Sequence, residues 1–312
     1  MRSVDSVFRK HVWMVNTLLR ATEGISLKQL DRRWMASEFS DGEHLSRTSF
    51  NRYREDIQEM FGVNIQCRRK AKDYYYFIDD PDALRSNSPQ TWMLHSLSVG
   101  NALQNSHTLQ HRILLEQMPG GQEYLQTVID AMQHGHTLHM HYHAFGKDET
   151  TLTLAPYCLK VFHQRWYVAG KSSRHRDDTL RVYALDRVTM LTETDTPFTM
   201  PVGFDAETYF ADEFGVMCGS DKPVETIVIR AYGTLANYLR TLPLHASQRE
   251  VDTQQGWADF QFRLRPTYDF RQELLSQADQ IEILSPESFK EEFVKVLRAA
   301  ARRNTTPKKK EK

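Results

Sequence analysis

The sequence predicts an α+β protein of several domains, and three patterns along the chain support this fold class. Three amphipathic helical segments followed by two short strands occupy the first 80 residues. Short strands at close spacing follow in the middle of the chain, which is typical of a small β-barrel. Near the C-terminus the expected elements run β-α-β-β-α-β, the order of a ferredoxin-like sandwich. A chain of 312 residues is long enough to bury several such cores.

Residues 1–80 have the layout of a winged helix-turn-helix, a DNA-binding fold. Three helices and two strands are expected at Ser6–Ala21, Leu27–Phe39, Arg47–Phe61, Val63–Arg68 and Tyr74–Ile78. Ser26 and Ser46 are placed to cap the second and third helices. Residues 1–72 carry 14 Lys and Arg against 9 Asp and Glu, a net charge of +5 in a neutral chain. This pattern favours DNA binding over the alternative, a three-helix protein-interaction module with solvated charges.

The third helix is predicted to have one buried face and one DNA-facing face. The residues expected to pack inward are Phe50, Tyr53, Ile57 and Phe61. The N-terminal side chains of the opposite face would enter the major groove. The residues predicted to read bases are Arg47, Thr48, Asn51 and Arg52. The residues predicted to hold phosphates, on the following strand and its basic tip, are Arg68, Arg69, Lys70 and Lys72.

Residues 81–120 are assigned to a helical linker or dimerisation segment. Pro81–Ser88 is polar and turn-prone, and Gln90–Leu109 is expected to be helical. The helix has two interpretations that the sequence does not separate. It either packs as plain structure, or it builds a dimer contact and transmits motion.

The middle of the chain is expected to begin with a helix at Gln122–Gln133. The strands that follow are predicted at Thr137–Phe145, Thr150–Leu154, Tyr157–Phe162, Arg165–Gly170, Leu180–Leu185 and Val188–Thr192. Alternation places Val182 toward a core, and Arg181 and Tyr183 on the other side of the strand. Aromatic side chains beside arginines suit a planar, anionic ligand. The alternative is an ordinary half-buried sheet with surface arginines.

The triplet Trp166-Tyr167-Val168 resembles the signature of WYL domains, small Sm-like or SH3-like barrels of bacterial transcriptional regulators. Val168 stands where the signature has leucine, a conservative change. Further motifs agree in order: Tyr142, Ala155-Pro156, Arg181-Val182-Tyr183, Asp186-Arg187-Val188, and a tail of Phe198, Pro201, Phe204, Asp205, Tyr209-Phe210 and Phe214-Gly215. Residues 121–218 are therefore assigned to a WYL domain. Residues 222–302, which contain Ile281-Glu282-Ile283-Leu284-Ser285-Pro286, resemble the extension that often follows it, and residues 303–312 are assigned to a disordered basic tail.

This resemblance implies a homodimeric bacterial transcription factor. Such a protein would bind a palindromic operator in double-stranded DNA and sense a nucleic-acid or nucleotide effector, in phage defence, the DNA-damage response or other stress regulation. The predicted effector-binding residues are Tyr142, Trp166, Tyr167, Arg181, Tyr183 and Arg187. The two arginines would clamp phosphates. The alternative is that they form structural ion pairs with Asp177, Asp178 or Asp186.

Five histidines, at positions 134, 136, 139, 141 and 143, form an unusual run. On a strand, His139, His141 and His143 share one face. No Asp, Glu or Cys lies within the run to complete a metal site, so an exposed polar face is preferred and no metal is expected.

Composition and motifs argue against other classes of function. Lys+Arg and Asp+Glu are equal at 40 each, so any nucleic-acid surface must be local. No apolar run of spanning length and no signal peptide are recognised. The three cysteines, an odd number, are far apart, which favours reduced thiols in a cytoplasmic protein. No G-x-S-x-G, H-E-x-x-H or P-loop motif occurs, so neither an enzyme nor a cofactor is expected.

Two alternatives to a regulator remain. One is an accessory protein that binds single-stranded nucleic acid and is only tethered by the winged helix. The other is an enzyme that the WYL domain controls.

Overall fold

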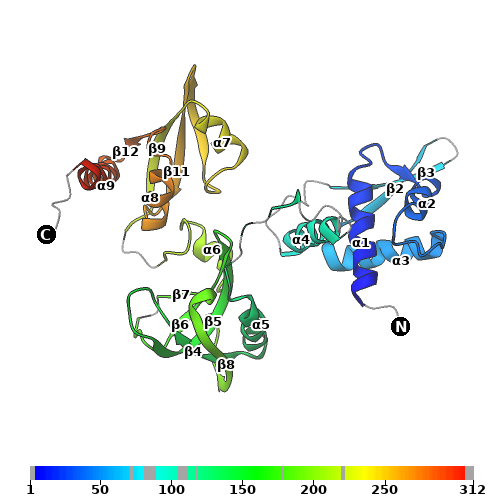
Figure 1. Cartoon of the computed structure of the whole chain (residues 1–312), viewed down its shortest axis with the longest axis horizontal. Helices are drawn as coiled ribbons and strands as arrows, with labels where there is room; N and C mark the ends of the chain where they lie inside the picture. The colour runs from blue at the N-terminus through cyan, green and yellow to red at the C-terminus, as the bar shows by residue number, and fades with distance from the viewer. Residues whose placement is uncertain are drawn as a thin grey trace. The chain divides into compact units, whose positions relative to one another are not determined.

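The structure is a computed structural model that describes residues 4–70, 73–80, 89–104, 112–114, 116, 119–177, 179–218 and 222–305. The chain divides into two compact units, Met1–Glu116 and Gln117–Lys312. Over the described residues both units are mixed α+β, with one antiparallel sheet in the first and two in the second (Figure 1). The coarse fold class predicted from the sequence is therefore confirmed.

The described residues of the first unit begin with three helices and a β-hairpin, which run to Ile78. The elements run α1 (Val4–Leu19), β1 (Ile25–Ser26), α2 (Leu27–Met35), α3 (Arg47–Phe61), β2 (Ile65–Lys70) and β3 (Asp73–Ile78). The bounds of α3 match the prediction, whereas α2 ends four residues earlier than the expected Phe39. The hairpin strands reach Lys70 and Asp73, so Arg69 and Lys70 lie on β2 rather than in the tip. The short strand β1, which was not predicted, pairs with β3.

Local signals set the ends of these helices. The Ser26 side chain accepts a hydrogen bond from Gln29 N at 3.3 Å, and Gln29 Oε1 accepts from Ser26 N at 3.0 Å, which is a capping box. Ser46 Oγ likewise accepts from Ser49 N at the start of α3. Gly62 ends α3 with φ at 66°, a conformation that costs glycine little.

Helix α4 (Pro89–Gln104) belongs to the first unit and packs on α1 and α3. Leu94 is 1% exposed in the same core as the three helices. Asn16 Nδ2 of α1 donates to Ser98 Oγ at 3.0 Å. One side of α4 is thus packed in the core of the first unit, and a role of this helix in dimerisation stays a prediction. Pro81–Ser88 and residues 105–109 of the predicted helix lie outside the described residues.

The second unit begins with a five-stranded antiparallel sheet in the order β7-β6-β5-β4-β8. Its elements are η3 (Gln122–Tyr124), α5 (Leu125–His134), β4 (His136–Tyr142), β5 (Thr150–Phe162), β6 (Arg165–Ser172), β7 (Arg181–Ala184), η4 (Leu185–Arg187) and β8 (Val188–Pro197). Val128 and Ala131 of α5 enter its core. Because the described pairings leave β7 and β8 at the edges, a closed barrel stays a prediction.

Strand β5 replaces two strands that the sequence analysis separated at Ala155-Pro156. The pairing of β5 with β6 shifts register between Pro156 and Cys158, and such an irregularity tolerates proline within a strand. Gly170 faces this point, where an added Cβ would lie 2.0 Å from Ala155 O. The break expected at proline is therefore a bulge in a continuous strand.

A second apolar layer explains why alternation assigned Tyr183 to the wrong side. The segment around α6 (Ala206–Phe210) packs Phe210 against Cys158 and Ala169, with Val182 beside them. Tyr183 lies in the main core of the sheet and is 8% exposed. Both sides of β7 are covered, so Tyr183 does not share an open face with Arg181 as the alternation suggested.

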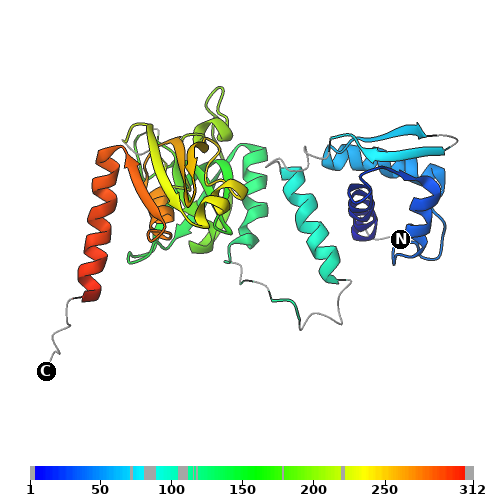
Figure 2. The same ribbon diagram turned by 90° about the horizontal axis from the view of Figure 1, so that it is seen from above.

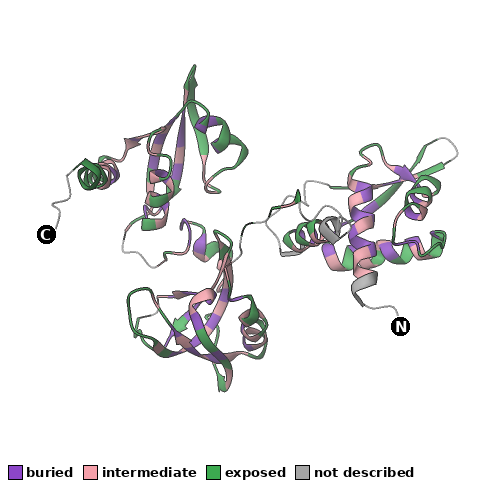
Figure 3. Cartoon of the chain, viewed as in Figure 1, coloured by how far each residue is buried: buried purple, intermediate pink, exposed green. Residues whose placement is uncertain are grey.

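The rest of the second unit is a four-stranded antiparallel sheet in the order β10-β11-β9-β12, with three helices. The elements run β9 (Glu225–Tyr232), α7 (Leu235–Thr241), β10 (Arg249–Gln254), β11 (Trp257–Leu264), α8 (Tyr268–Leu275), β12 (Ile281–Ser285) and α9 (Glu287–Thr305). All three helices contribute buried side chains to one core (Figure 3). Helix α9 continues through Thr305, into the tail predicted to be disordered, while residues 306–312 lie outside the described residues (Figure 2).

The segment before β9 is anchored to this second core. Phe214 is buried there, with its ring 5.7 Å from that of Phe162 and 5.4 Å from that of Phe270. Asp269 Oδ2 accepts hydrogen bonds from Val216 N at 2.9 Å and Met217 N at 3.0 Å. The two sheets of the second unit are therefore joined by packed aromatic rings and a shared carboxylate.

Candidate nucleic-acid and effector-binding surfaces

The exposed face of α3 carries the four side chains predicted to read bases. Arg47, Thr48, Asn51 and Arg52 are all exposed. The opposite face is fully packed, since Phe50, Tyr53, Ile57 and Phe61 are each at most 5% exposed. The predicted division of this helix into inner and outer faces is thus confirmed. Whether the outer face binds DNA stays a prediction.

Contacts with α1 and the hairpin hold α3 in place. His11 of α1 is 2% exposed, and its Nε2 lies 3.1 Å from Asp56 Oδ2 of α3. Burial lowers the pKa of His11, although the hydrogen bond with Asp56 acts in the opposite direction. The Arg54 guanidinium lies 5.8 Å from the Tyr76 ring centre on β3. A helix fixed on both sides presents its outer side chains at a defined angle.

The basic residues predicted to hold phosphates have different surroundings. Arg68 donates to the main-chain oxygen of Glu23 at 2.7 Å and lies over Phe77, so it has a structural role in this unit. Arg69 and Lys70 are exposed on β2, where they pair with Tyr74 and Asp73. Lys72 lies outside the described residues.

A basic hollow on the same unit was not recognised in the sequence. A cavity of about 460 Å³ is lined by residues that include Arg20, Arg32, Arg33 and Glu23. The signal that could have found it is the adjacent Arg32-Arg33 on α2, on the polar side of a short amphipathic helix. These arginines add positive charge to the unit that carries α3.

Two of the predicted effector residues are core residues of the five-stranded sheet. Tyr142 and Tyr183 are 9% and 8% exposed and meet edge to face, with ring centres 5.0 Å apart. The Tyr183 hydroxyl donates to Ser172 Oγ at 2.8 Å. Burial is the main cause that raises the pKa of Tyr183. The rings of Tyr142 and Tyr183 therefore pack inside the five-stranded sheet and leave little exposed surface on which a ligand could stack.

Arg181 and Arg187 have different partners. Arg181 donates to Asp177 Oδ2 at 2.6 Å, which is one of the ion pairs weighed as the alternative to ligand binding. Arg187 lies with its guanidinium carbon 3.9 Å from the centre of the Phe145 ring. Among the described residues Arg187 has no carboxylate partner. The neighbouring Asp186 pairs with Arg165 instead, with Asp186 Oδ2 3.5 Å from Arg165 Nε. Asp178 lies outside the described residues.

Trp166 and Tyr167 are both half-buried on β6. Trp166 packs against the core of the sheet. Burial raises the pKa of Tyr167, while the nearby positive charges of Arg165 and Arg187 act to lower it. The structure therefore brings Tyr142 and Tyr183 into contact and pairs Arg181 with Asp177, while Arg187 acts on Tyr167 through its charge.

The family model of the WYL domain matches residues 123–193, which run from η3 into β8. This part of the chain is a WYL domain. The model of the WCX domain matches residues 223–301, the four-stranded sheet and its helices. The triplet at 166–168 thus lies on β6 of a WYL domain, as the resemblance indicated. The chain matches no curated protein.

Solved structures that match the chain include two with low sequence identity. Proteasome accessory factor B/C (PafBC) of Arthrobacter aurescens is 20% identical with a TM-score of 0.40, and the match covers 99% of this chain and 49% of that one. A CRISPR Cas-related protein is 11% identical with a TM-score of 0.37, over 96% and 86% of the two chains. The chain thus spans about half the length of the PafBC chain. The domain assignment rests on the two family models.

The WYL domain also carries the exposed aromatic that the sequence analysis placed inside a strand. Phe145 was predicted to end the strand Thr137–Phe145, but β4 ends at Tyr142 and Phe145 is 71% exposed. A large aromatic directly before Gly146 in a polar loop is the signal that marks it. Together with Arg187 it forms an open cation-π pair beside Tyr167, which we call the Arg187–Phe145 platform.

The predicted histidine face is confirmed for His139 and His141, whereas His143 lies beyond the end of β4 at Tyr142. Leu138 and Met140 are fully buried, while His139 and His141 are half-buried on the other side. The ring centres of these two histidines lie 5.4 Å apart, and His141 Nδ1 is 3.6 Å from Glu149 Oε2.

Across the described residues, no helix is both long and apolar enough to cross a membrane.

Proposed function

We propose that this chain is an effector-responsive bacterial transcriptional regulator. In this proposal the first unit is a winged helix-turn-helix that binds double-stranded DNA, and the WYL domain senses a nucleic-acid or nucleotide-like ligand. The protein has no catalytic role and acts on DNA in the cytoplasm, in phage defence or a stress response. The WYL domain at residues 123–193 supports this class of function, because such domains belong to regulators of this kind.

The observation that carries the proposal is the two-sided construction of α3. Four polar side chains capable of base contacts stand on one face, and the other face is locked into the core. Arginine and asparagine offer the paired donors and acceptors that distinguish guanine and adenine in the major groove. The neighbouring strand β2 presents Arg69 and Lys70 to solvent, where they can neutralise phosphates. This combination of polar readout and flanking charge favours double-stranded DNA as the partner.

The sensor half of the proposal rests on the Arg187–Phe145 platform. A guanidinium on an exposed ring provides one charged and one stacking group within a few ångströms. Such a pair suits a nucleotide, whose phosphate and base need both kinds of contact. Arg181 lies on the same sheet and can join only if it leaves Asp177. Regulation then requires that the effector bind one arrangement of the DNA-binding units more tightly than another.

The regulator is proposed to act as a homodimer on a palindromic operator, since two-fold DNA sites mirror two-fold proteins. Residues 225–305 are proposed to be a ferredoxin-like sandwich, because the order β10-β11-β9-β12 with helices after the first and third strands is that of the fold. This domain and α4 are the proposed dimer contacts. Light scattering of the full chain at micromolar concentration should give twice the monomer mass. A monomer that binds the operator with full affinity would contradict the dimer.

The test of the function is selection of bound duplexes from a random DNA pool by the full chain, followed by footprinting. A regulator should enrich a palindromic sequence and protect two half-sites about one helical turn, or a multiple of it, apart. Addition of short single-stranded oligonucleotides should then change operator affinity. If no sequence is enriched and affinity depends only on the length of single strands, the regulator proposal fails and the tethered accessory protein replaces it.

A further inference from the structure

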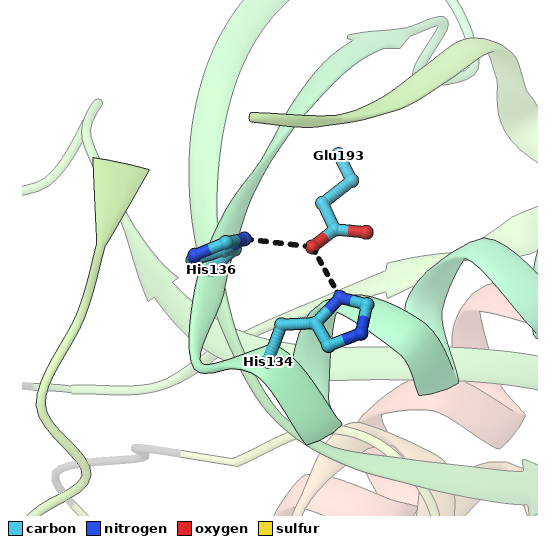
Figure 4. A group of neighbouring side chains, drawn as sticks. All are labelled: His134, His136 and Glu193. Carbon is cyan, nitrogen blue, oxygen red and sulfur yellow. Dashed lines mark hydrogen bonds and ion pairs between the residues drawn. The ribbon is translucent and has the colours of Figure 1, made fainter. Parts of the chain in front are cut away.

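Two histidines and a glutamate from three elements meet where α5 turns into β4. His134 is the last residue of α5, His136 is the first of β4, and Glu193 lies on β8. Glu193 Oε1 lies 2.8 Å from Nδ1 of each imidazole (Figure 4). The glutamate is 57 and 59 positions away from the two histidines in sequence. The histidine run alone therefore gave no sign of a third ligand.

The backbone around this corner fixes the three side chains. Gly135 adopts φ of 69°, which ends α5 and turns the chain directly into β4. Its carbonyl accepts a hydrogen bond from Phe198 N at 2.8 Å, beyond the end of β8. The pairing of β4 with β8 shifts register between His136 and Leu138, and such bulges re-aim side chains. The convergence is thus built by the fold of the WYL domain, not by two mobile surface residues.

We propose that His134, His136 and Glu193 bind a divalent transition-metal ion, with Zn²⁺ as the reference ion. Two imidazole nitrogens and one carboxylate oxygen form a donor set that zinc accepts. The three ligand atoms lie within 4.8 Å of one another. Bonds of about 2.0–2.1 Å in a tetrahedral site place ligand atoms about 3.3 Å apart. The two hydrogen-bonded contacts therefore need to widen by about half an ångström, which small rotations of the three side chains can supply.

The exposure of the ligands defines the kind of site. The side chains of His134, His136 and Glu193 are 57%, 33% and 26% exposed. Three protein ligands at the surface leave a fourth position for water, unlike the closed four-ligand sites that hold structural zinc. Each ligand comes from a different element, so a bound ion joins α5, β4 and β8. The ion binds only the folded arrangement and stabilises the WYL domain.

Zinc binding is measured on the full chain, without a polyhistidine tag and after treatment with a chelator. Calorimetric titration with ZnCl₂ should show saturable binding of one equivalent, and zinc should raise the melting temperature. Glu193→Gln keeps the shape of the side chain but removes the anionic ligand. Loss of a group that merely orients a metal ligand costs about 10–100-fold in affinity, and Glu193→Gln should cost at least as much. His134→Ala with His136→Ala should abolish both responses.

The matched control is His139→Ala with His141→Ala, two half-buried histidines on the same strand. This variant should bind zinc as the wild type does. The proposal is overturned if the wild type binds no zinc, if Glu193→Gln binds it with unchanged affinity, or if the control variant is the one that loses binding. Circular dichroism without zinc checks folding, and Glu193→Gln decides alone if the double variant at the site does not fold. If neither the wild type nor any variant responds to zinc, the three side chains only form hydrogen bonds with one another and bind no metal.

Discussion

Arg52→Ala is the sharpest test of the DNA-reading face. Arg52 is exposed, and its guanidinium carbon lies 5.5 Å from the centre of the Tyr53 ring. Losing an exposed contact of this kind costs about 0.5–1 kcal/mol of folding stability. Losing a bidentate base contact costs about 1–3 kcal/mol of discrimination, or about 5- to 140-fold in affinity for the right sequence. The variant should therefore stay folded and lose preference for its operator.

The assay is fluorescence anisotropy with the selected operator and with a scrambled duplex of equal length. Lys70→Ala should weaken both duplexes equally and reduce the salt slope by about 0.9, as expected for one phosphate contact. Arg68→Ala is a poor probe, because it also removes the hydrogen bond to Glu23. Arg176→Ala, an exposed arginine of the second unit, is the charge-matched control. If Arg52→Ala leaves the ratio of the two affinities unchanged, α3 does not read sequence as proposed.

Three further predictions concern stability and sensing. Arg187→Ala should weaken binding of a short single-stranded oligonucleotide by about 1.5–3 kcal/mol in anisotropy, because the guanidinium proposed to bind a phosphate is lost while the Phe145 ring remains. Tyr183→Phe should lower stability by about 1 kcal/mol, or roughly 2–4 °C in melting temperature, by removing the buried bond to Ser172, and should leave oligonucleotide binding unchanged. His11 has its pKa lowered by burial, so the unfolded chain takes up the proton first and stability falls as the pH drops below about 6.5. In melts from pH 7.5 to 5.5, His11→Gln should reduce this loss.

These three outcomes have matched controls. Arg176→Ala, an exposed arginine on the same unit, should leave oligonucleotide binding intact. Equal binding by wild type and Arg187→Ala would remove the platform from the sensor. A Tyr183→Phe variant that melts like the wild type but no longer binds oligonucleotide would show that the Tyr183 hydroxyl contacts the ligand. For the loss of stability in acid, the comparison is His175→Gln, which changes an exposed histidine. If the melting temperature of His11→Gln falls with pH as steeply as that of the wild type, His11 is not the cause of the loss.

The parts of the fold that depend on local signals were predictable from the sequence. Helix α3 begins after the Ser46 cap and ends at Gly62, and both signals lie within a few residues of the helix. Its buried face follows from the spacing of Phe50, Tyr53, Ile57 and Phe61, because a helix repeats every 3.6 residues. Exposure of Arg47, Thr48, Asn51 and Arg52 follows from the same spacing. The outer surface of the candidate DNA site was therefore within reach of the sequence alone.

Features that depend on contacts between distant segments could not be predicted from the sequence. Alternation on β7 placed Val182 toward the core and Tyr183 toward solvent, but Tyr183 lies in the main core of the sheet and Val182 packs beside the distant segment around Phe210. Pro156 stops a strand in most contexts, yet a register shift opposite Gly170 carries β5 through it. Glu193 meets His134 and His136 only through the pairing of β8 with β4. In each case the deciding neighbour is at least 14 positions away, and no local pattern points to it.

The anchor formed by Asp269 and Phe214 has a practical consequence for dissecting this protein. A fragment cut at residue 218, where the sequence motifs end, would keep Phe214 but strip away Phe270, against which its ring packs. The amides of Val216 and Met217 would lose the carboxylate that binds them. A fragment starting at residue 222 would instead leave Asp269 facing water and an open apolar hollow. Ligand-binding or melting data on either half would therefore describe a damaged piece, and residues 119–305 are the smallest unit worth expressing separately from the DNA-binding part.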